Sequence, residues 1–167
     1  MKIIDCITFF DEEMLLDFRL NQLNDKIDKF VIVESKFTHS GKKKKLNFDI
    51  KKYYNFKNKI DYLVINEEPS EIQEVKDKDT LEEKNSKLIL NGMARDFYQR
   101  NYISNALSNI DPNDYVIISD LDEIPNLEIV NFENINNNIF LFEQKMFYYK
   151  LNLIYPNFKW HGTKACK

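Results

Sequence analysis

Short apolar runs alternate with longer stripes of apolar residues along the chain. The runs are rich in β-branched residues and predict strands at residues 2–9, 29–35, 60–65 and 115–119. The stripes have the spacing of packed helices, and we expect one helix after the first strand and another over residues 92–110. This order predicts an α/β fold in which a mostly parallel central sheet has helices on both faces.

The remaining segments are more polar or more aromatic. Asp11 is expected to cap the first helix, which would pack through an apolar stripe from Leu16 to Ile27. Residues 66–91 are the most polar part of the chain and predict a charged surface insertion that is partly helical. Residues 137–155 predict further strands around an aromatic cluster.

Composition limits the classes of protein that fit. The 167 residues, 43% of them hydrophobic, can bury one core, so we expect a single domain over residues 1–167. The net charge of -3 argues against a nucleic-acid partner. No stretch approaches the ~20 apolar residues of a membrane span, so we expect a cytoplasmic protein with no membrane span. Cys6 and Cys166 lack metal-ligand spacing and are expected to be reduced thiols.

The predicted topology brings four segments to one place. In open parallel sheets, ligands bind outside the carboxyl ends of the strands. The segments expected there are residues 9–12, residues 34–41, the start of the 92–110 helix, and residues 120–123. We therefore look for functional residues among these four segments.

The last of these segments ends the stretch VIISDLDEIP with three carboxylates in four residues. In extended backbone Asp120 and Asp122 point the same way, and at roughly 7 Å two such charges repel by about 2 kcal/mol. Their oxygens are hard ligands of the kind that Mg²⁺ or Mn²⁺ shares with substrate phosphates. A solvated strand end would contain the same residues, so the motif alone leaves both interpretations open.

Other residues at the expected crevice also have two interpretations. Glu34 ends the second strand, where it could contact a ribose or simply be a strand-end carboxylate. Gly41 could permit a tight turn or a close approach of the backbone. Asp96 and Arg100 are four residues apart, which is also the spacing of an ordinary helix ion pair. The lysines of residues 42–45 are typical of a solvated loop, and we leave them out of the site.

Several blocks of the sequence together resemble glycosyltransferase family 17. In chain order they are IIDCITFFDEEMLLDFRLNQL, DKFVIVESKFTHSGKKK, ARDFYQRNYI, VIISDLDEIP, FYYKLN and WHGTKA. They cover nearly the whole chain except residues 66–91. The resemblance implies a GT-A-like (Rossmann-like) nucleotide-sugar fold and a metal-dependent, inverting transfer of a sugar. The implied donor is a UDP-sugar, with N-acetylglucosamine as the sugar. The implied cofactor is Mn²⁺ or Mg²⁺, and the implied acceptor is a glycan or another hydroxyl compound.

The resemblance also implies roles for individual residues. Asp122 and Asp120 are expected to bind the metal ion. The residues expected to contact the donor are Phe9, Glu34, Thr38, Gly41, Arg95, Arg100 and Asp120. One of the two arginines is expected to face the metal and the diphosphate. Arg19, within the apolar stripe of its helix, is instead expected to be a structural ion partner.

An inverting transfer needs a base that takes the proton of the acceptor hydroxyl. Glu123 and Glu143 are the carboxylates expected near the crevice, and they are our candidates for this catalytic role. The family continues beyond the stretch that WHGTKA resembles, so we expect that this chain lacks the C-terminal segment of the family. That segment could hold the base. Trp160, Tyr148 and Tyr149 could stack on sugar rings or form an aromatic core.

Two other functions remain open at this point. The first is a catalytically incomplete module that binds a nucleotide sugar but lacks the base. The second is a haloacid-dehalogenase-like phosphatase, which also has a strand followed by Asp-x-Asp. That chemistry calls for Thr or Val where this chain has Ile124, and for a long chain after it.

Overall fold

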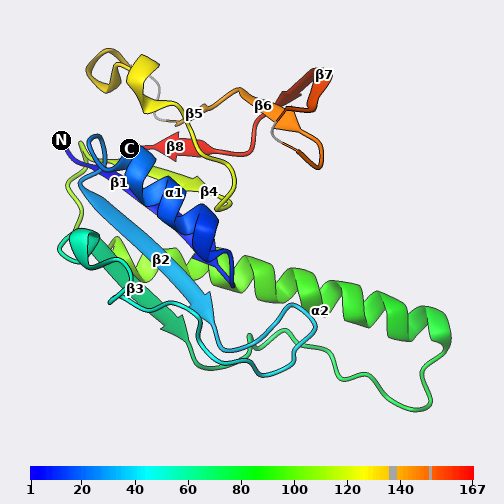
Figure 1. Ribbon diagram of the computed structural model, residues 1–167. Helices are drawn as coiled ribbons and strands as arrows, with labels where there is room; N and C mark the ends of the chain where they lie inside the picture. The colour runs from blue at the N-terminus through cyan, green and yellow to red at the C-terminus, as the bar shows by residue number, and fades with distance from the viewer. Residues whose placement is uncertain (136–138, 151) are drawn as a thin grey trace.

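The computed structural model describes residues 1–135, 139–150 and 152–167. A six-stranded sheet has the strand order β3-β2-β1-β4-β8-β5 (Figure 1). Four of its strands are parallel: β1 (Ile3–Phe9), β2 (Lys29–Ser35), β3 (Ile60–Ile65) and β4 (Tyr115–Ser119). Two short strands extend the sheet beyond β4 in antiparallel pairing: β8 (Lys164–Cys166) and β5 (Ile139–Leu141). The predicted α/β class and mostly parallel sheet are confirmed.

Helices cover both faces of this sheet, as predicted (Figure 1). On one face, Leu16 and Leu20 of α1 (Glu13–Leu23) pack in a core with Ile7 of β1. On the other face, Cys6 packs in a second core with residues from the end of α2 (Leu81–Asn101) and from the 3₁₀ helix η2 (Tyr102–Ala106). Because both faces are covered, the parallel strands are continuous apolar runs, which is why they could be read from the sequence.

The second helix differs from the prediction. It begins at Leu81 rather than at residue 92, and it gives way to η2 before residue 110. Thr80 accepts a hydrogen bond from the backbone N–H of Glu83, and the Glu83 side chain accepts one from the N–H of Thr80. This capping box starts the helix inside the charged segment. Residues 66–91 are therefore partly helical, as expected, but their helical part belongs to α2.

The first helix also begins differently from the prediction. Glu12, and not Asp11, occupies the cap position, and its side chain makes no capping hydrogen bond to the helix. The Glu12 carboxylate instead accepts hydrogen bonds from the backbone N–H groups of Phe10 and Asp11, at 3.2 and 3.1 Å. It therefore orders the turn between β1 and α1.

The C-terminal part of the chain adds a separate two-stranded hairpin of β6 (Gln144–Phe147) and β7 (Ile154–Trp160). It projects from the end of the sheet (Figure 1). The strands predicted within residues 137–155 are thus partly confirmed, while 136–138 and 151 lie outside the described residues. The other short elements are 3₁₀ helices: η1 (Tyr54–Phe56), η3 (Leu127–Ile129) and η4 (Phe132–Asn134). Within the described residues, no helix has both the length and the apolar character to cross a membrane.

Candidate active site

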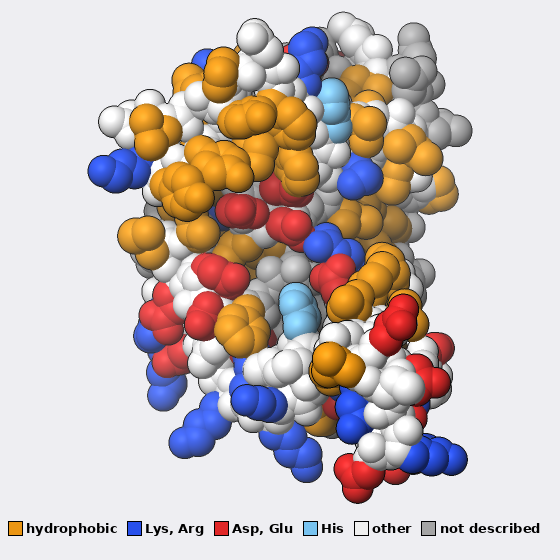
Figure 2. Space-filling view, turned by 90° about the vertical axis from the view of Figure 1, so that its right-hand side faces the viewer, with side chains coloured by type: hydrophobic (Ala, Val, Ile, Leu, Met, Phe, Trp, Pro, Cys, Tyr) orange, Lys and Arg blue, Asp and Glu red, His pale blue; other side chains and the backbone are white. Residues whose placement is uncertain are grey.

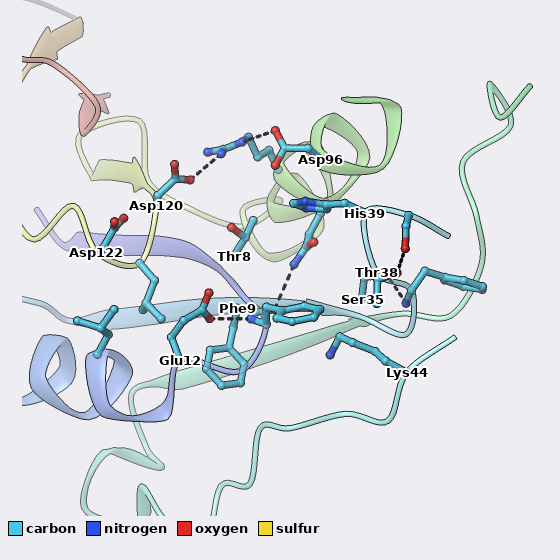
Figure 3. A pocket seen from close by; sticks show the side chains of 17 residues that line it. Thr8, Phe9, Glu12, Ser35, Thr38, His39, Lys44, Asp96, Asp120 and Asp122 are labelled. Atoms are coloured by element: carbon cyan, nitrogen blue, oxygen red, sulfur yellow. Dashed lines mark hydrogen bonds and ion pairs between the residues drawn. The ribbon is translucent and has the colours of Figure 1, made fainter. Parts of the chain in front are cut away.

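A cavity of about 680 Å³ opens at the carboxyl ends of β1, β2 and β4 (Figure 3). The chain passes from β1 outward to β2 and β3, and then returns to place β4 on the other side of β1. The cavity therefore lies at the switch point of the sheet, where parallel α/β folds bind ligands. The predicted residues in its wall are Phe9, Thr38, Arg100, Asp120 and Asp122.

The acid pair forms one wall of this cavity. Figure 3 shows the carboxylates of Asp120 and Asp122 projecting to the same side of their loop. The expected extended backbone is wrong here, because β4 ends at Ser119 and the backbone N–H of Glu123 donates to the Asp120 carbonyl at 3.1 Å, which closes a turn over residues 120–123. Asp120 pairs with the guanidinium of Arg100 at 2.6 Å. Asp122 is exposed, and its carboxylate pairs with no other residue in the described part of the chain.

The donor set at this wall is small. Among the described residues, no group of three or more His, Cys, Asp or Glu side chains could hold a metal ion by itself. The two carboxylates would fit a cation that takes its remaining ligands from substrate phosphates and water, as Mg²⁺ commonly does. Metal binding by Asp120 and Asp122 therefore stays a prediction that the geometry accommodates.

Arg19 holds the acid-bearing turn from beneath. Its guanidinium is fully buried and pairs with the Asp5 carboxylate at 2.7 and 2.8 Å. It also donates to the Ser119 hydroxyl at 2.6 Å and to the backbone carbonyls of residues 120, 121 and 123 at 3.1–3.2 Å. A buried charge needs such complete pairing. The expectation that Arg19 is structural is confirmed, and its partners include the backbone that carries the acids.

Arg100 connects α2 to the acid pair. Its side chain pairs with Asp96 at 3.1 Å and with Asp120 at 2.6 Å. Burial lowers the pKa of Arg100, but its hydrogen bonds and charge interactions with these two carboxylates raise the pKa more. Arg100 therefore brings a fixed positive charge to the cavity wall beside the acids. A diphosphate would find a cationic partner there.

Arg95, the other predicted arginine, lies outside the cavity wall. It forms an ion pair with Glu68, with distances of 2.6 and 3.1 Å, and donates to the backbone carbonyl of His39 at 2.9 Å. Gly41 has the positive φ of 82° that its predicted tight turn requires, and a Cβ there would lie 2.4 Å from Arg95 Nη2. Arg95 and Gly41 thus shape the loop that carries Thr38, and the structure brings neither to the cavity.

Glu34 is also placed differently from the prediction. It is fully buried and is absent from the cavity wall. Its oxygens accept hydrogen bonds from the backbone N–H of Asn47 at 2.8 Å, the N–H of Phe48 at 3.1 Å and the Tyr62 hydroxyl at 2.7 Å, and they pair with Lys44. Burial and this hydrogen bond to Glu34 raise the pKa of Tyr62. With these partners, Glu34 is a buried structural carboxylate.

The two candidate bases lie in different surroundings. Glu123 accepts a hydrogen bond from Trp160 Nε1 at 2.6 Å and another from the backbone N–H of Asp120 at 3.1 Å. A Cβ at Gly162 would lie 1.7 Å from Glu123 Oε1, so only glycine leaves room for this carboxylate. Glu143 is exposed and pairs with Lys159 at 2.9 Å, which lowers its pKa. The structure places Glu123 beside the acids and Glu143 outside both cavities next to them.

The model of glycosyltransferase family 17 matches residues 1–165. The chain belongs to this family. Similar relatives are β-1,4-mannosyl-glycoprotein 4-β-N-acetylglucosaminyltransferases from Rattus norvegicus and Homo sapiens, each 28% identical over 132 residues. The match covers 74% of this chain but 22% of each relative, so the chain spans about a fifth of their length. No solved structure matches the chain significantly.

Within this family 17 chain, several residues in the cavity wall were absent from the predicted site. They are mainly polar side chains at strand ends and in loops: Thr8, Glu12, Ser35, Lys44, Asp96 and Gln99. Gln99 donates from Nε2 to the backbone carbonyls of Val33 at 2.8 Å and Phe9 at 3.4 Å, and so joins the ends of β1 and β2. A polar residue at the carboxyl end of an apolar run was the available signal for Thr8 and Ser35.

The position of Lys44 in the cavity wall could not be predicted from the charge of its loop. The run of lysines at residues 42–45 predicts a solvated loop. In the structure Lys44 lies in the cavity wall, pairs with the buried Glu34 and has its ammonium 5.0 Å from the centre of the Phe10 ring. Its role depends on a partner ten residues away, which a charge run does not reveal.

Proposed function

We propose that this chain forms the donor-binding part of a metal-dependent, inverting glycosyltransferase. It would move a sugar, N-acetylglucosamine by its resemblance to the relatives, from a UDP-sugar to a glycan or another hydroxyl acceptor. The observation that carries the proposal is the acid pair Asp120 and Asp122 in the wall of a cavity at the switch point of a family 17 chain. A GT-A-like description of the fold belongs to the same proposal.

The cavity has the size and chemistry for the donor. Its volume of about 680 Å³ is within the range of small-molecule sites. The exposed ring of Phe10 supplies aromatic surface for a base, and the hydroxyls of Ser35 and Thr38 supply polar partners for a ribose. Arg100 stands beside the acids, where a diphosphate would lie.

Asp122 and Asp120 are the residues that would hold Mn²⁺ or Mg²⁺. A bound divalent ion would offset the charge of the diphosphate and of the UDP leaving group. Asp122 has no competing partner among the described residues, whereas Asp120 is shared with Arg100. We therefore assign the direct ligand to Asp122 and give Asp120 a contact to the ion, its water or the donor ribose.

The transfer forms one bond, breaks one bond and transfers one proton. The acceptor oxygen forms a bond to the anomeric carbon, while the bond from that carbon to the diphosphate oxygen breaks and its electron pair leaves with UDP. The hydroxyl proton passes to a base. Glu123 is the better placed candidate, because the ion pair with Lys159 makes Glu143 a weaker base.

A second candidate function is a nucleotide-sugar-binding module without turnover. The arrangement of Glu123 favours it, since each of its oxygens already accepts a hydrogen bond from the protein. Glu143 lies outside both cavities. Under this alternative the donor would bind as proposed, and the base would be supplied by another segment or another chain. The phosphatase reading gains no support, because the family 17 model covers residues 1–165.

Calorimetry of UDP with and without Mn²⁺, followed by an assay of UDP release from UDP-N-acetylglucosamine, tests the proposal. We expect Mn²⁺-dependent binding, and turnover separates the transferase from the binding module. Asp122→Ala should abolish the Mn²⁺ dependence, whereas Asp77→Ala, at an exposed acid outside the cavities, should leave it unchanged. UDP binding that is indifferent to Mn²⁺ in the wild type would refute the metal assignment.

A further inference from the structure

A second cavity adjoins the candidate donor site. Its volume is about 340 Å³, and it shares Leu15, Asp120 and Asp122 with the first cavity. Its other wall is made by β6 and by Trp160 at the end of β7. A molecule in this second cavity would therefore lie next to whatever the acid pair holds in the first.

One polar atom in this second wall lacks a partner. Gln144 lines the cavity, and its Oε1 is buried without a hydrogen bond from any described residue. A buried acceptor left unpaired loses its hydrogen bonds to water without replacement, so native proteins seldom retain one without a reason. The missing partner is a donor, and the hydroxyl of a ligand would supply it.

The hairpin extends this cavity with an exposed row of aromatic rings. Trp160 stacks beside Phe158 with ring centres 6.3 Å apart, Phe158 lies 5.6 Å from Tyr155, and Tyr155 lies 5.9 Å from Tyr148. Each of these rings is between 40% and 48% exposed. We call these four residues the aromatic row. In Figure 2 hydrophobic side chains gather directly above the central acidic group.

We propose that the second cavity is the acceptor subsite, that it binds one pyranose ring of a neutral oligosaccharide, and that further rings lie along the aromatic row. The inference rests on the proposed function and names the place of the acceptor within it. A pyranose has apolar C–H faces for the rings and hydroxyl donors for Gln144 and the acids. An apolar peptide would leave these oxygens without donors, which makes a sugar the better match.

The chain contains one tryptophan, Trp160, and it lies in the wall of this cavity. Its fluorescence therefore reports occupation of the proposed subsite directly. We suggest titrating the whole chain, with UDP and Mn²⁺ present and absent, with N,N′-diacetylchitobiose, mannobiose, cellobiose and lactose. We expect at least one disaccharide to change the emission in a saturable way. UDP and Mn²⁺ binding is measured separately by calorimetry.

Two variants identify the contacts. Gln144→Leu should raise the Kd of the disaccharide about tenfold, the effect of losing roughly one hydrogen bond. Its melting temperature should not fall, because the change removes an unpaired oxygen. Phe147→Ala, which removes an aromatic ring from the β6 wall of the cavity, should also weaken binding. Tyr54→Ala, at an exposed aromatic residue of η1 outside this cavity, is the matched control and should have no effect.

The outcomes separate this inference from the proposed function. If UDP and Mn²⁺ bind but no disaccharide changes the emission, the acceptor subsite is wrong and the donor site stands. If a disaccharide binds but UDP does not, the sugar site stands and the proposed function is wrong. A Gln144→Leu chain that binds normally, or that loses stability and binding together, would overturn the role of Gln144.

Discussion

The parallel sheet and the β6–β7 hairpin meet at the acid pair, yet they are built by opposite means. Residues of β1 and β2 are nearly all buried, while every residue of β7 is exposed. The polar groups beneath the acids are saturated by Arg19, whereas the hairpin side leaves Gln144 without a donor. Under the two proposals, this contrast fits a donor side whose turn is already paired by Arg19 in the folded chain and a hairpin side on which Gln144 gains a partner only from a ligand.

The largest effect on stability is expected from removing the buried positive charge of Arg19. Arg19→Met leaves Asp5 buried without its partner, and breaking such a pair costs about 3–5 kcal/mol. We expect a loss of this size in the free energy of unfolding, measured with urea. As a control, Lys52→Ala breaks an exposed pair with Glu13 and should cost at most about 1 kcal/mol. Equal losses of unfolding free energy in the two variants would contradict the claim that the buried pair stabilises the fold more than the exposed pair does.

A second test compares apolar residues of the two regions. Leu20→Ala empties part of the core beneath the sheet and should cost about 2–5 kcal/mol. Ile154→Ala, at a residue of β7 that is 53% exposed, should change the free energy of unfolding by about 0.5 kcal/mol or less. Both values come from urea titrations at one temperature. A large loss at Ile154 would mean that the hairpin is packed more firmly than its exposure indicates.

A third test uses pH and the thiol within the sheet. Burial, with a smaller effect of the Asp5 charge, raises the pKa of Cys6 from its usual value of 9.0. The unfolded chain therefore loses this proton above about pH 9 while the folded chain keeps it. We expect the free energy of unfolding to fall by up to about 1.4 kcal/mol per pH unit in that range.

Comparison with Cys6→Ala isolates the contribution of the thiol. The variant should be less stable at neutral pH, because it loses buried volume, but its stability should fall less steeply above pH 9. Parallel curves for the two chains would show that Cys6 does not titrate as its burial requires.

The smallest effect is expected at the hairpin surface. Lys159→Ala removes the partner of Glu143, so the lowered pKa of Glu143 should return toward its ordinary value. An NMR titration of the Glu143 side chain measures this change. The melting temperature at neutral pH should stay the same, because exposed ion pairs contribute little. A clear fall in the melting temperature would show that the pair fastens the hairpin.

The strands were predictable because of where they lie. The expected strands at 29–35, 60–65 and 115–119 agree with β2, β3 and β4 residue for residue. β2 and β4 are apolar runs because a parallel strand covered on both faces must be one, while β3 is a half-buried edge strand whose β-branched and aromatic residues still marked it. The start of α2 was missed because its capping box, Thr80 with Glu83, lies in a segment dominated by charge. The capping-box residues were visible in the sequence, but the high charge of the whole segment favoured a surface insertion instead of a helix start.

The candidate site was less predictable. The sequence indicates which residues lie near the cavity, but it does not show which of their side chains face it. Glu34 and Arg95 come from the expected segments, but their side chains do not face the cavity. Glu34 accepts a hydrogen bond from Tyr62, and Arg95 forms an ion pair with Glu68. Trp160 meets Glu123 across 37 residues of sequence, and no local spacing reveals such a contact. Asp120 and Asp122 could be predicted at the crevice because they directly follow an apolar strand, but the turn over residues 120–123, and not strand alternation, sets the direction of their side chains.

The hydrogen bonds from Arg19 to three carbonyls of the acid-bearing turn have one more consequence. They hold the turn in place through a side chain of α1. Folding therefore fixes the conformation of this turn, and under the proposed function a nucleotide would bind without having to order it. A short peptide that contains only VIISDLDEIP would have the same acids and none of this advantage.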